Sequence, residues 1–143
     1  MALLKSTTVD QVAEAVRRAD PTDRLVVTLA ALPGGSPWTH ALICGQFDIE
    51  RYFLTLTERA VMVHDIKFLR HRPGRLLHRI PRAEAARGFT DLHRRMLWSY
   101  FRFHLPGEAQ ATRLNVRRAW RPELDRLAAA LTAEQPAAPA PVR

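Results

Sequence analysis

The basic side chains in the middle of this 143-residue chain are the ones best suited to chemistry, and that chemistry is anion binding. Between Arg51 and Leu105 the chain carries twelve basic and four acidic residues, so this stretch accounts for the whole net charge of +8. Planar guanidinium groups bind phosphate and carboxylate through paired hydrogen bonds. We therefore predict a cationic rim formed by Lys67, Arg70, Arg72, Arg75, Arg79, Arg82, Arg94 and Arg95.

The same arginines also have a simpler explanation. Only Lys5 and Lys67 of the 22 basic residues are lysine, and alanine is abundant, a usage that GC-rich coding produces without any functional selection. Loops and the outward positions of strands must be polar in any protein. A solvated surface without a partner therefore remains an alternative to the rim.

A second group of candidate binding residues alternates along one stretch: Trp98, Tyr100, Arg102 and His104. Aromatic side chains with interleaved arginine stack nucleobases in proteins that bind single strands. The same residues could face a protein partner. Packing beneath one of the chain's own helices is the alternative use for the two aromatic rings.

The histidines and the single cysteine do not form a recognisable reactive centre. His64, His71 and His78 fall on strand, loop and strand, without the carboxylate or thiolate neighbours of a metal site, so we predict no metal. Cys44 beside His40 or His64 could act as a nucleophile, but a lone strand cysteine is usually a small hydrophobic residue. The sequence contains no familiar catalytic motif, and we expect a non-catalytic protein without a cofactor.

Length and composition predict one domain in a reducing compartment. A chain of 143 residues with 47% apolar side chains can bury its own core. One cysteine cannot build a disulfide framework, and the first residues lack the order of a signal peptide. No apolar run approaches the roughly 20 residues that span a bilayer. We therefore expect a cytoplasmic location, with peripheral membrane contact open.

Hydrophobic periodicity indicates the elements that must position these residues. A short amphipathic helix is expected at Thr8–Ala19, an amphipathic helix at 120–132 that begins with Trp120, and a disordered Pro/Ala tail at 134–143. Eight candidate strands lie within 24–118: 24–32, 38–47, 52–57, 60–66, 75–80, 87–92, 97–105 and 109–118. The segment Arg82–Arg95 is ambiguous between this strand near Arg87–Leu92, with a basic turn at His93–Arg95, and a partly helical structure.

Alternation within the strands predicts which side chains face the core. The clearest case places Leu97, Ser99, Phe101, Phe103 and Leu105 on one face. In the following strand we expect Leu114 and Val116 to point inward, and Arg113, Asn115 and Arg117 to point outward. The fold class is then α+β and mainly β. We predict a bent antiparallel small barrel or sandwich of about seven strands over residues 1–133, capped by the C-terminal helix and preceded by an extra helix.

The element order resembles the pleckstrin-homology-like (PH-like) superfold in its bacterial and GRAM-type versions. Tyr52, Phe53, Leu56, Thr57 and Arg59 are similar to a strand and turn of those domains, and Trp120 to the early tryptophan of their closing helix. The resemblance covers about Arg24–Leu131 and implies a scaffold for binding. The first hairpin, with Pro33 to Pro37, lacks the basic residues of the lipid-binding members, and the extra helix and strand also depart from the pattern.

Three functions remain open at this point. The preferred one is a non-catalytic PH-like module that recognises a protein or an anionic membrane surface through the arginine-rich rim. A nucleic-acid binder using the rim with Trp98 and Tyr100 is the second. The third is a barrel around a small molecule, acting as a carrier or biosynthetic enzyme, with His64, His78, Tyr100 and His104 as acid or base groups. Self-association through an open strand edge at Arg24–Leu32 is also possible.

Overall fold

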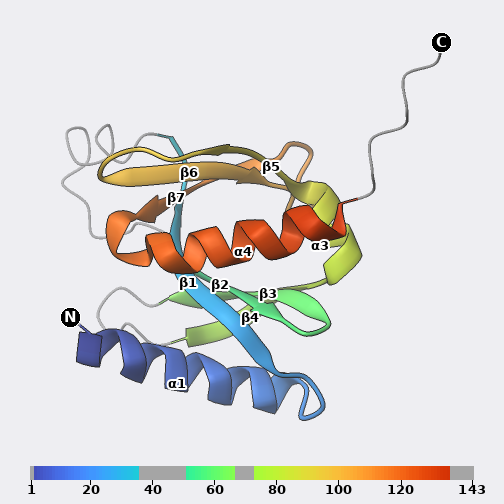
Figure 1. Cartoon of the computed structure of the whole chain (residues 1–143). Helices are drawn as coiled ribbons and strands as arrows, with labels where there is room; N and C mark the ends of the chain where they lie inside the picture. The colour runs from blue at the N-terminus through green and yellow to red at the C-terminus, as the bar shows by residue number, and fades with distance from the viewer. Residues whose placement is uncertain (1, 36–50, 67–72, 136–143) are drawn as a thin grey trace.

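Seven antiparallel strands form one strongly bent sheet with helices on both sides (Figure 1). The structure, a computed structural model, describes residues 2–35, 51–66 and 73–135. Its strand order is β4-β3-β2-β1-β7-β6-β5. The elements are α1 (Ala2–Ala19), β1 (Leu25–Pro33), β2 (Tyr52–Thr57), β3 (Ala60–Ile66), β4 (Pro73–Pro81), α3 (Arg82–Gly88), β5 (Phe89–His93), β6 (Trp98–Phe103), β7 (Thr112–Arg117), a 3-10 turn (Arg118–Trp120) and α4 (Arg121–Glu134).

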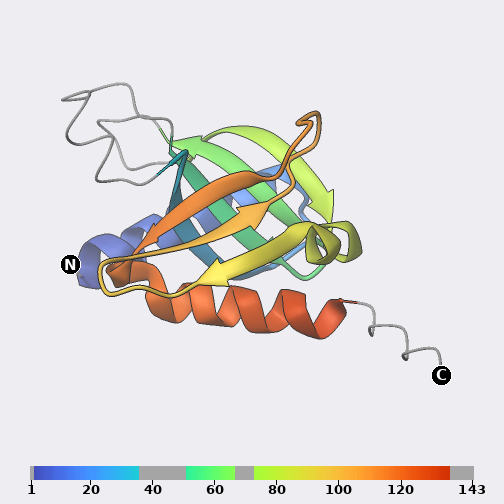
Figure 2. The ribbon, with the colours of Figure 1, turned by 90° about the horizontal axis from the view of Figure 1, so that it is seen from above.

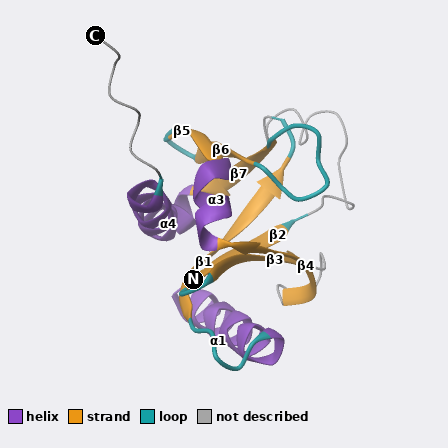
Figure 3. Ribbon diagram, turned by 90° about the vertical axis from the view of Figure 1, so that its right-hand side faces the viewer, coloured by secondary structure: helices purple, strands orange, loops and turns teal. Residues whose placement is uncertain are grey.

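Strand β1 joins the two halves of the sheet. Its residues from Leu25 to Ala31 pair with β2, whereas Leu32 and Pro33 pair with Asn115 and Leu114 of β7. One half-sheet is β1–β4 and the other is β5–β7 joined to the end of β1, so the two share β1 and lie on either side of a bend, as the view in Figure 3 shows. This arrangement leaves a concave apolar surface that another element must cover.

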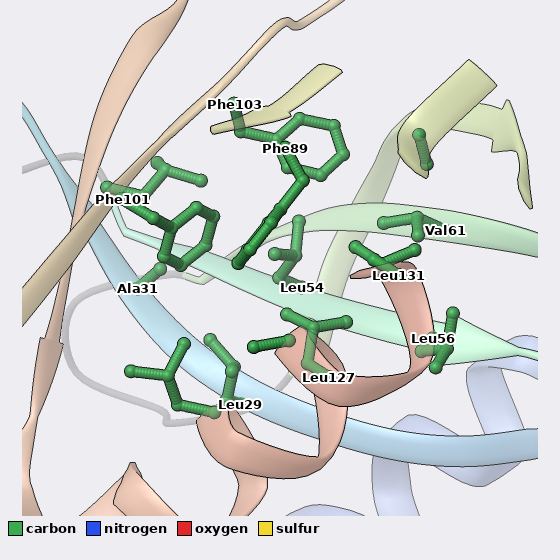
Figure 4. Packing of buried hydrophobic residues seen from close by; sticks show 14 of the residues in the cluster. Leu29, Ala31, Leu54, Leu56, Val61, Phe89, Phe101, Phe103, Leu127 and Leu131 are labelled. Carbon is green, nitrogen blue, oxygen red and sulfur yellow. The ribbon is translucent and has the colours of Figure 1, made fainter. Parts of the chain in front are cut away.

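Helix α4 fills that concave surface (Figures 1 and 4). Leu124, Leu127 and Leu131 recur at the predicted helical spacing and are fully buried, and Trp120 packs partly buried against the same cluster. Burying apolar area between helix and sheet is the main stabilising term in such a fold. The sheet contributes side chains from both halves, among them Leu29, Leu54, Leu56, Val61, Phe89, Phe101 and Phe103.

Helix α1 covers the opposite face of the β1–β4 half-sheet (Figure 3). Val12 and Val16 are fully buried against Phe53, Met62 and Ile66. The two cores follow from strand alternation, because successive residues of β2 and β3 point to opposite faces. Leu54, Leu56, Val61 and Val63 belong to the core that α4 covers, while Phe53, Met62 and Ile66 belong to the core that α1 covers.

The predicted fold class is confirmed as a mainly β, α+β fold with seven antiparallel strands and helices at both ends. The sheet is not closed, since β4 and β5 form its two edges. Strand β1 lies inside the sheet because Leu32 and Pro33 pair with β7, whereas its residues from Leu25 to Ala31 pair with β2 alone, so self-association through this edge stays a prediction. Where β1 has no neighbouring strand, α4 approaches it, and Arg126 Nη2 donates to the Val26 carbonyl over 3.1 Å.

The ambiguous segment Arg82–Arg95 is a helix followed by a strand. Ala83, Glu84, Ala85 and Ala86 are strong helix formers, and two of these alanines are buried. Helix α3 therefore occupies the start of the strand expected at Arg87–Leu92, and β5 begins at Phe89. The expected strand 38–47 and most of the basic loop at 67–74 lie outside the described residues.

Several predicted boundaries also require correction. Helix α1 begins at Ala2 and not at Thr8, because the preceding alanine, leucine and lysine favour a helix. Strand β7 begins at Thr112 and not at residue 109. The prediction of a disordered tail is wrong for Glu134 and Gln135, because Glu134 ends α4 and Gln135 Nε2 donates to the carbonyls of Ala86 and Phe89, each over 3.0 Å. The rest of that segment, 136–143, lies outside the described residues.

The packing of α4 predicts a large difference between two leucine truncations. Leu127→Ala removes fully buried methyl groups and leaves a cavity, so we expect the free energy of unfolding to fall by about 2–5 kcal/mol. Leu97→Ala, at a 49% exposed leucine, should change it by about 0.5 kcal/mol or less. Urea unfolding followed by circular dichroism measures both. Similar losses from the two variants would contradict this account of the core.

Candidate functional site

Two arginine- and tryptophan-containing segments meet at one end of the molecule. They are Arg94–Trp98, the turn from β5 into β6, and Arg117–Arg121, the passage from β7 into α4. Because β6 and β7 are antiparallel, Trp98 pairs with Arg117, and the Arg118 amide donates to the Leu97 carbonyl over 2.9 Å. Figure 2 shows the two segments side by side. We call this surface the basic end: Arg94, Arg95, Met96, Leu97, Trp98, Arg117, Arg118, Trp120 and Arg121.

The first turn of α4 holds the β5–β6 turn in place. Arg121 Nη2 donates to the carbonyl of Arg95 and, over 3.4 Å, to that of Met96. Arg94 Nε donates to Asp125 Oδ1 over 2.8 Å. Arg95, Arg117 and Arg118 form no ion pair with a carboxylate in the described part of the chain. Those three guanidinium groups are therefore available for an external anion.

A cavity of about 110 Å³ lies beside the basic end. Trp98, Trp120, Arg117 and Arg51 contribute to its walls, with Thr8 of α1 on another side. The Arg117 guanidinium lies over the Trp98 ring, 5.4 Å from its centroid. Burial lowers the pKa of the Arg51 guanidinium below its ordinary value, and repulsion from Arg117 lowers it further. An anion would relieve this repulsion.

Tyr100 is enclosed by its neighbours on the outer face of β5–β7. His93 stacks on its ring at 4.7 Å between centroids, and the Arg113 guanidinium lies 3.7 Å from the ring centroid. These two residues come from the strands on either side of β6. The Arg95 guanidinium lies 5.7 Å away. Intramolecular packing therefore occupies Tyr100 and leaves little ring surface for a nucleobase.

The structure separates the other residues of the predicted rim. Arg79 pairs with Asp20 at 3.4 Å and Asp23 at 3.7 Å, near the end of α1. Arg82 pairs with Glu134 at the last residue of α4, and Arg94 with Asp125 near its start. Because an α-helix rises about 1.5 Å per residue, pairing with opposite ends of α4 holds Arg82 and Arg94 far apart.

The other basic residues predicted to bind, from the rim and from the second group, lie in three places. Arg75 is exposed on edge strand β4, and Arg102 pairs with Asp91 of β5 at 3.7 Å. Lys67, Arg70 and Arg72 lie outside the described residues. The structure therefore brings together Arg94, Arg95 and Trp98 from the predicted set, and it adds Arg117, Arg118 and Arg121.

Sequence reasoning missed these three arginines because they follow the segment that carries the excess charge. A usable signal existed, since Arg94–Trp98 and Arg117–Arg121 both begin with paired arginines and contain a tryptophan. Asn115 points outward as predicted, but its burial was not expected. It lies on the outer face but is 1% exposed, because its Nδ2 donates to the carbonyls of Leu32, Gly34 and Gly35 at 2.9–3.1 Å.

The histidines of the described segments do not gather into a metal site. Among residues 2–35, 51–66 and 73–135, no group of three or more His, Cys, Asp or Glu side chains could hold a metal ion. His71 and Cys44 lie outside these segments. His64 is 2% exposed, Tyr100 lies on the outer face, and His104 is exposed, so these proposed acid or base groups do not line one interior cavity.

The helices of the described segments include none that is both long and apolar enough to cross a membrane. In comparisons with known proteins, no family model and no curated protein sequence matches this chain.

His64 lies in the wall of a groove between α1 and β3–β4, of about 560 Å³, and burial lowers the pKa of its imidazole below 6.5. The adjacent Asp65 carboxylate raises that pKa by a smaller amount. The lowered pKa means that the unfolded chain takes up a proton more readily than the folded one. Stability should therefore be lost as the pH falls through 6.5 toward the lowered pKa.

This linkage can be measured as the pH dependence of the free energy of unfolding. We expect the loss between about pH 7.5 and 5.5 to be smaller in His64→Gln than in the parent chain. His104→Gln, at an exposed position, serves as the control and should retain the parent slope. A parent-like slope in His64→Gln would show that the imidazole carries no such penalty.

Proposed function

We propose that this chain is a non-catalytic binding module that recognises a partner bearing phosphate or carboxylate groups through the basic end. The observation that carries the proposal is the meeting of arginines from two distant segments, of which Arg95, Arg117 and Arg118 have no carboxylate partner among the described residues. Guanidinium groups that are not already paired can bind such groups bidentately.

A PH-like build is part of this proposal. Seven antiparallel strands followed by a C-terminal helix, with Trp120 packed at its start, support it. Helix α1 and helix α3, which lies between β4 and β5 in the chain, are additions to that plan. A scaffold of this kind does not by itself fix a ligand, so the functional argument rests on the basic end. We propose a cytoplasmic location because the single cysteine suits a reducing compartment.

An anionic surface is favoured over a nucleic acid by the surroundings of Tyr100. Proteins that bind single strands use aromatic faces on which successive bases stack. His93 and Arg113 already pack against the Tyr100 ring, and Arg117 covers part of Trp98. The basic end therefore offers hydrogen-bond donors and charge more readily than stacking surfaces.

Neutralising two arginines at the basic end tests the proposal. We expect Arg117→Gln with Arg118→Gln to weaken binding to poly-glutamate and to inorganic polyphosphate about thirtyfold, from about 1 kcal/mol per arginine. Arg17→Gln with Arg18→Gln is the matched control, because it removes the same charge from an adjacent exposed pair on α1. Isothermal titration calorimetry at low salt measures both.

The control variant should bind within about threefold of the parent, since its arginines already pair with Glu14. Equal weakening in the two variants would mean that only net charge matters, and no binding by the parent chain would remove the proposed function. Circular dichroism confirms that each variant is folded.

A further inference from the structure

The tip of the β5–β6 turn exposes two adjacent apolar side chains. Met96 is 78% and Leu97 49% exposed, and they are the large apolar residues that are exposed in the described part of the chain. Apolar side chains scattered singly over a surface need no explanation, but an adjacent pair inside a cluster of arginines does. The turn lies at the same end of the molecule as the start of α4 (Figure 2).

This exposure comes from the fold of the turn and not from a loose loop. The carbonyls of Arg95, Met96 and Leu97 each accept a hydrogen bond from the segment that begins α4. Arg94 ties the same turn to Asp125. A turn held at four successive residues has already lost its conformational freedom, so a partner that binds Met96 and Leu97 orders little additional backbone.

Cations and aromatic rings surround this apolar tip. Arg95 precedes it within the turn, and exposed Arg117 and Arg118 lie on the neighbouring segment. Behind it, Trp98 and Trp120 are half-buried. Proteins that enter the interface of an anionic bilayer show the same order. Their apolar side chains reach deepest, tryptophan lies at the headgroup level, and basic residues surround them.

The shape of the basic end favours a bilayer over other anionic partners. A projecting turn with its apolar side chains outward needs a surface that yields around it, and the headgroup region of a bilayer does so. A nucleic acid would use the arginines but would leave Met96 and Leu97 in water. An acidic protein would need an apolar pocket of its own to receive Met96 and Leu97.

We propose that the basic end docks on anionic lipid bilayers, with Met96 and Leu97 entering the interface and Arg95, Arg117 and Arg118 binding lipid phosphates. This inference rests on the proposed anion-binding function and names its partner. The chain then lies with the start of α4 and the β5–β6 turn toward the membrane. Helix α1 covers the opposite face of the other half-sheet.

The test compares vesicles with a soluble polyanion. Vesicles of phosphatidylserine and phosphatidylcholine are sedimented with the full chain, and binding to poly-glutamate and to single-stranded DNA is measured in parallel. Met96→Ser with Leu97→Ser keeps every charge, so it should weaken vesicle binding at least about tenfold and leave poly-glutamate binding unchanged. The matched control, Met96→Leu with Leu97→Met, keeps both side chains apolar and should bind vesicles like the parent.

Each other result would overturn the proposal. Vesicle binding retained by the serine variant would show that the arginines act without insertion. Binding to poly-glutamate but not to vesicles would leave the proposed function intact and make the partner a protein. Tighter binding to single-stranded DNA than to the vesicles would assign the surface to nucleic acid. Failure to bind any of the probes would remove the proposed function together with this inference.

Discussion

The packing of α4 into the bent sheet is the interaction on which the rest of the structure depends. Leu124, Leu127 and Leu131 are fully buried between the two half-sheets that share β1. Polar contacts hold each end of this helix to a neighbouring element. Arg121 and Asp125 at its start bind the β5–β6 turn, and Glu134 at its last residue pairs with Arg82 of α3. The position of the basic end is therefore a consequence of apolar burial, with the polar contacts setting its details.

Most of the fold was predictable because each strand alternates and each long helix has one apolar face. Strands β2 and β3 formed as expected, and the leucines of α4 identified the capping helix. Strand β6 is shorter than the expected 97–105, and Leu97, expected on the core face, is exposed in the turn before it. Two features were not predictable from local pattern. The alanines of 82–88 favour a helix, but a segment of 7 residues is too short to show a helical repeat of apolar positions. The place of β1 inside the sheet depends on its pairing with β7, 80 or more residues away along the chain.

The candidate site was predicted only in part, because charge along a chain does not show where ion pairs form. Arg79, Arg82 and Arg102 belong to the basic stretch, yet each faces a carboxylate from another element. Arg117 and Arg118 fall outside that stretch and gain their importance from the antiparallel pairing of β6 with β7. Pairing in space, and not the density of arginine in the sequence, decides which cations remain for a partner.

Methionine methyl resonances offer the most direct measurement of how the molecule meets its partner. The chain has three methionines, of which Met62 is fully buried beneath α1 and Met96 is 78% exposed on the basic end. In anionic bicelles that carry a spin label in their acyl chains, we expect the Met96 methyl signal to broaden strongly and the Met62 signal to stay sharp. A sharp Met96 signal from bicelle-bound protein would contradict the proposed orientation.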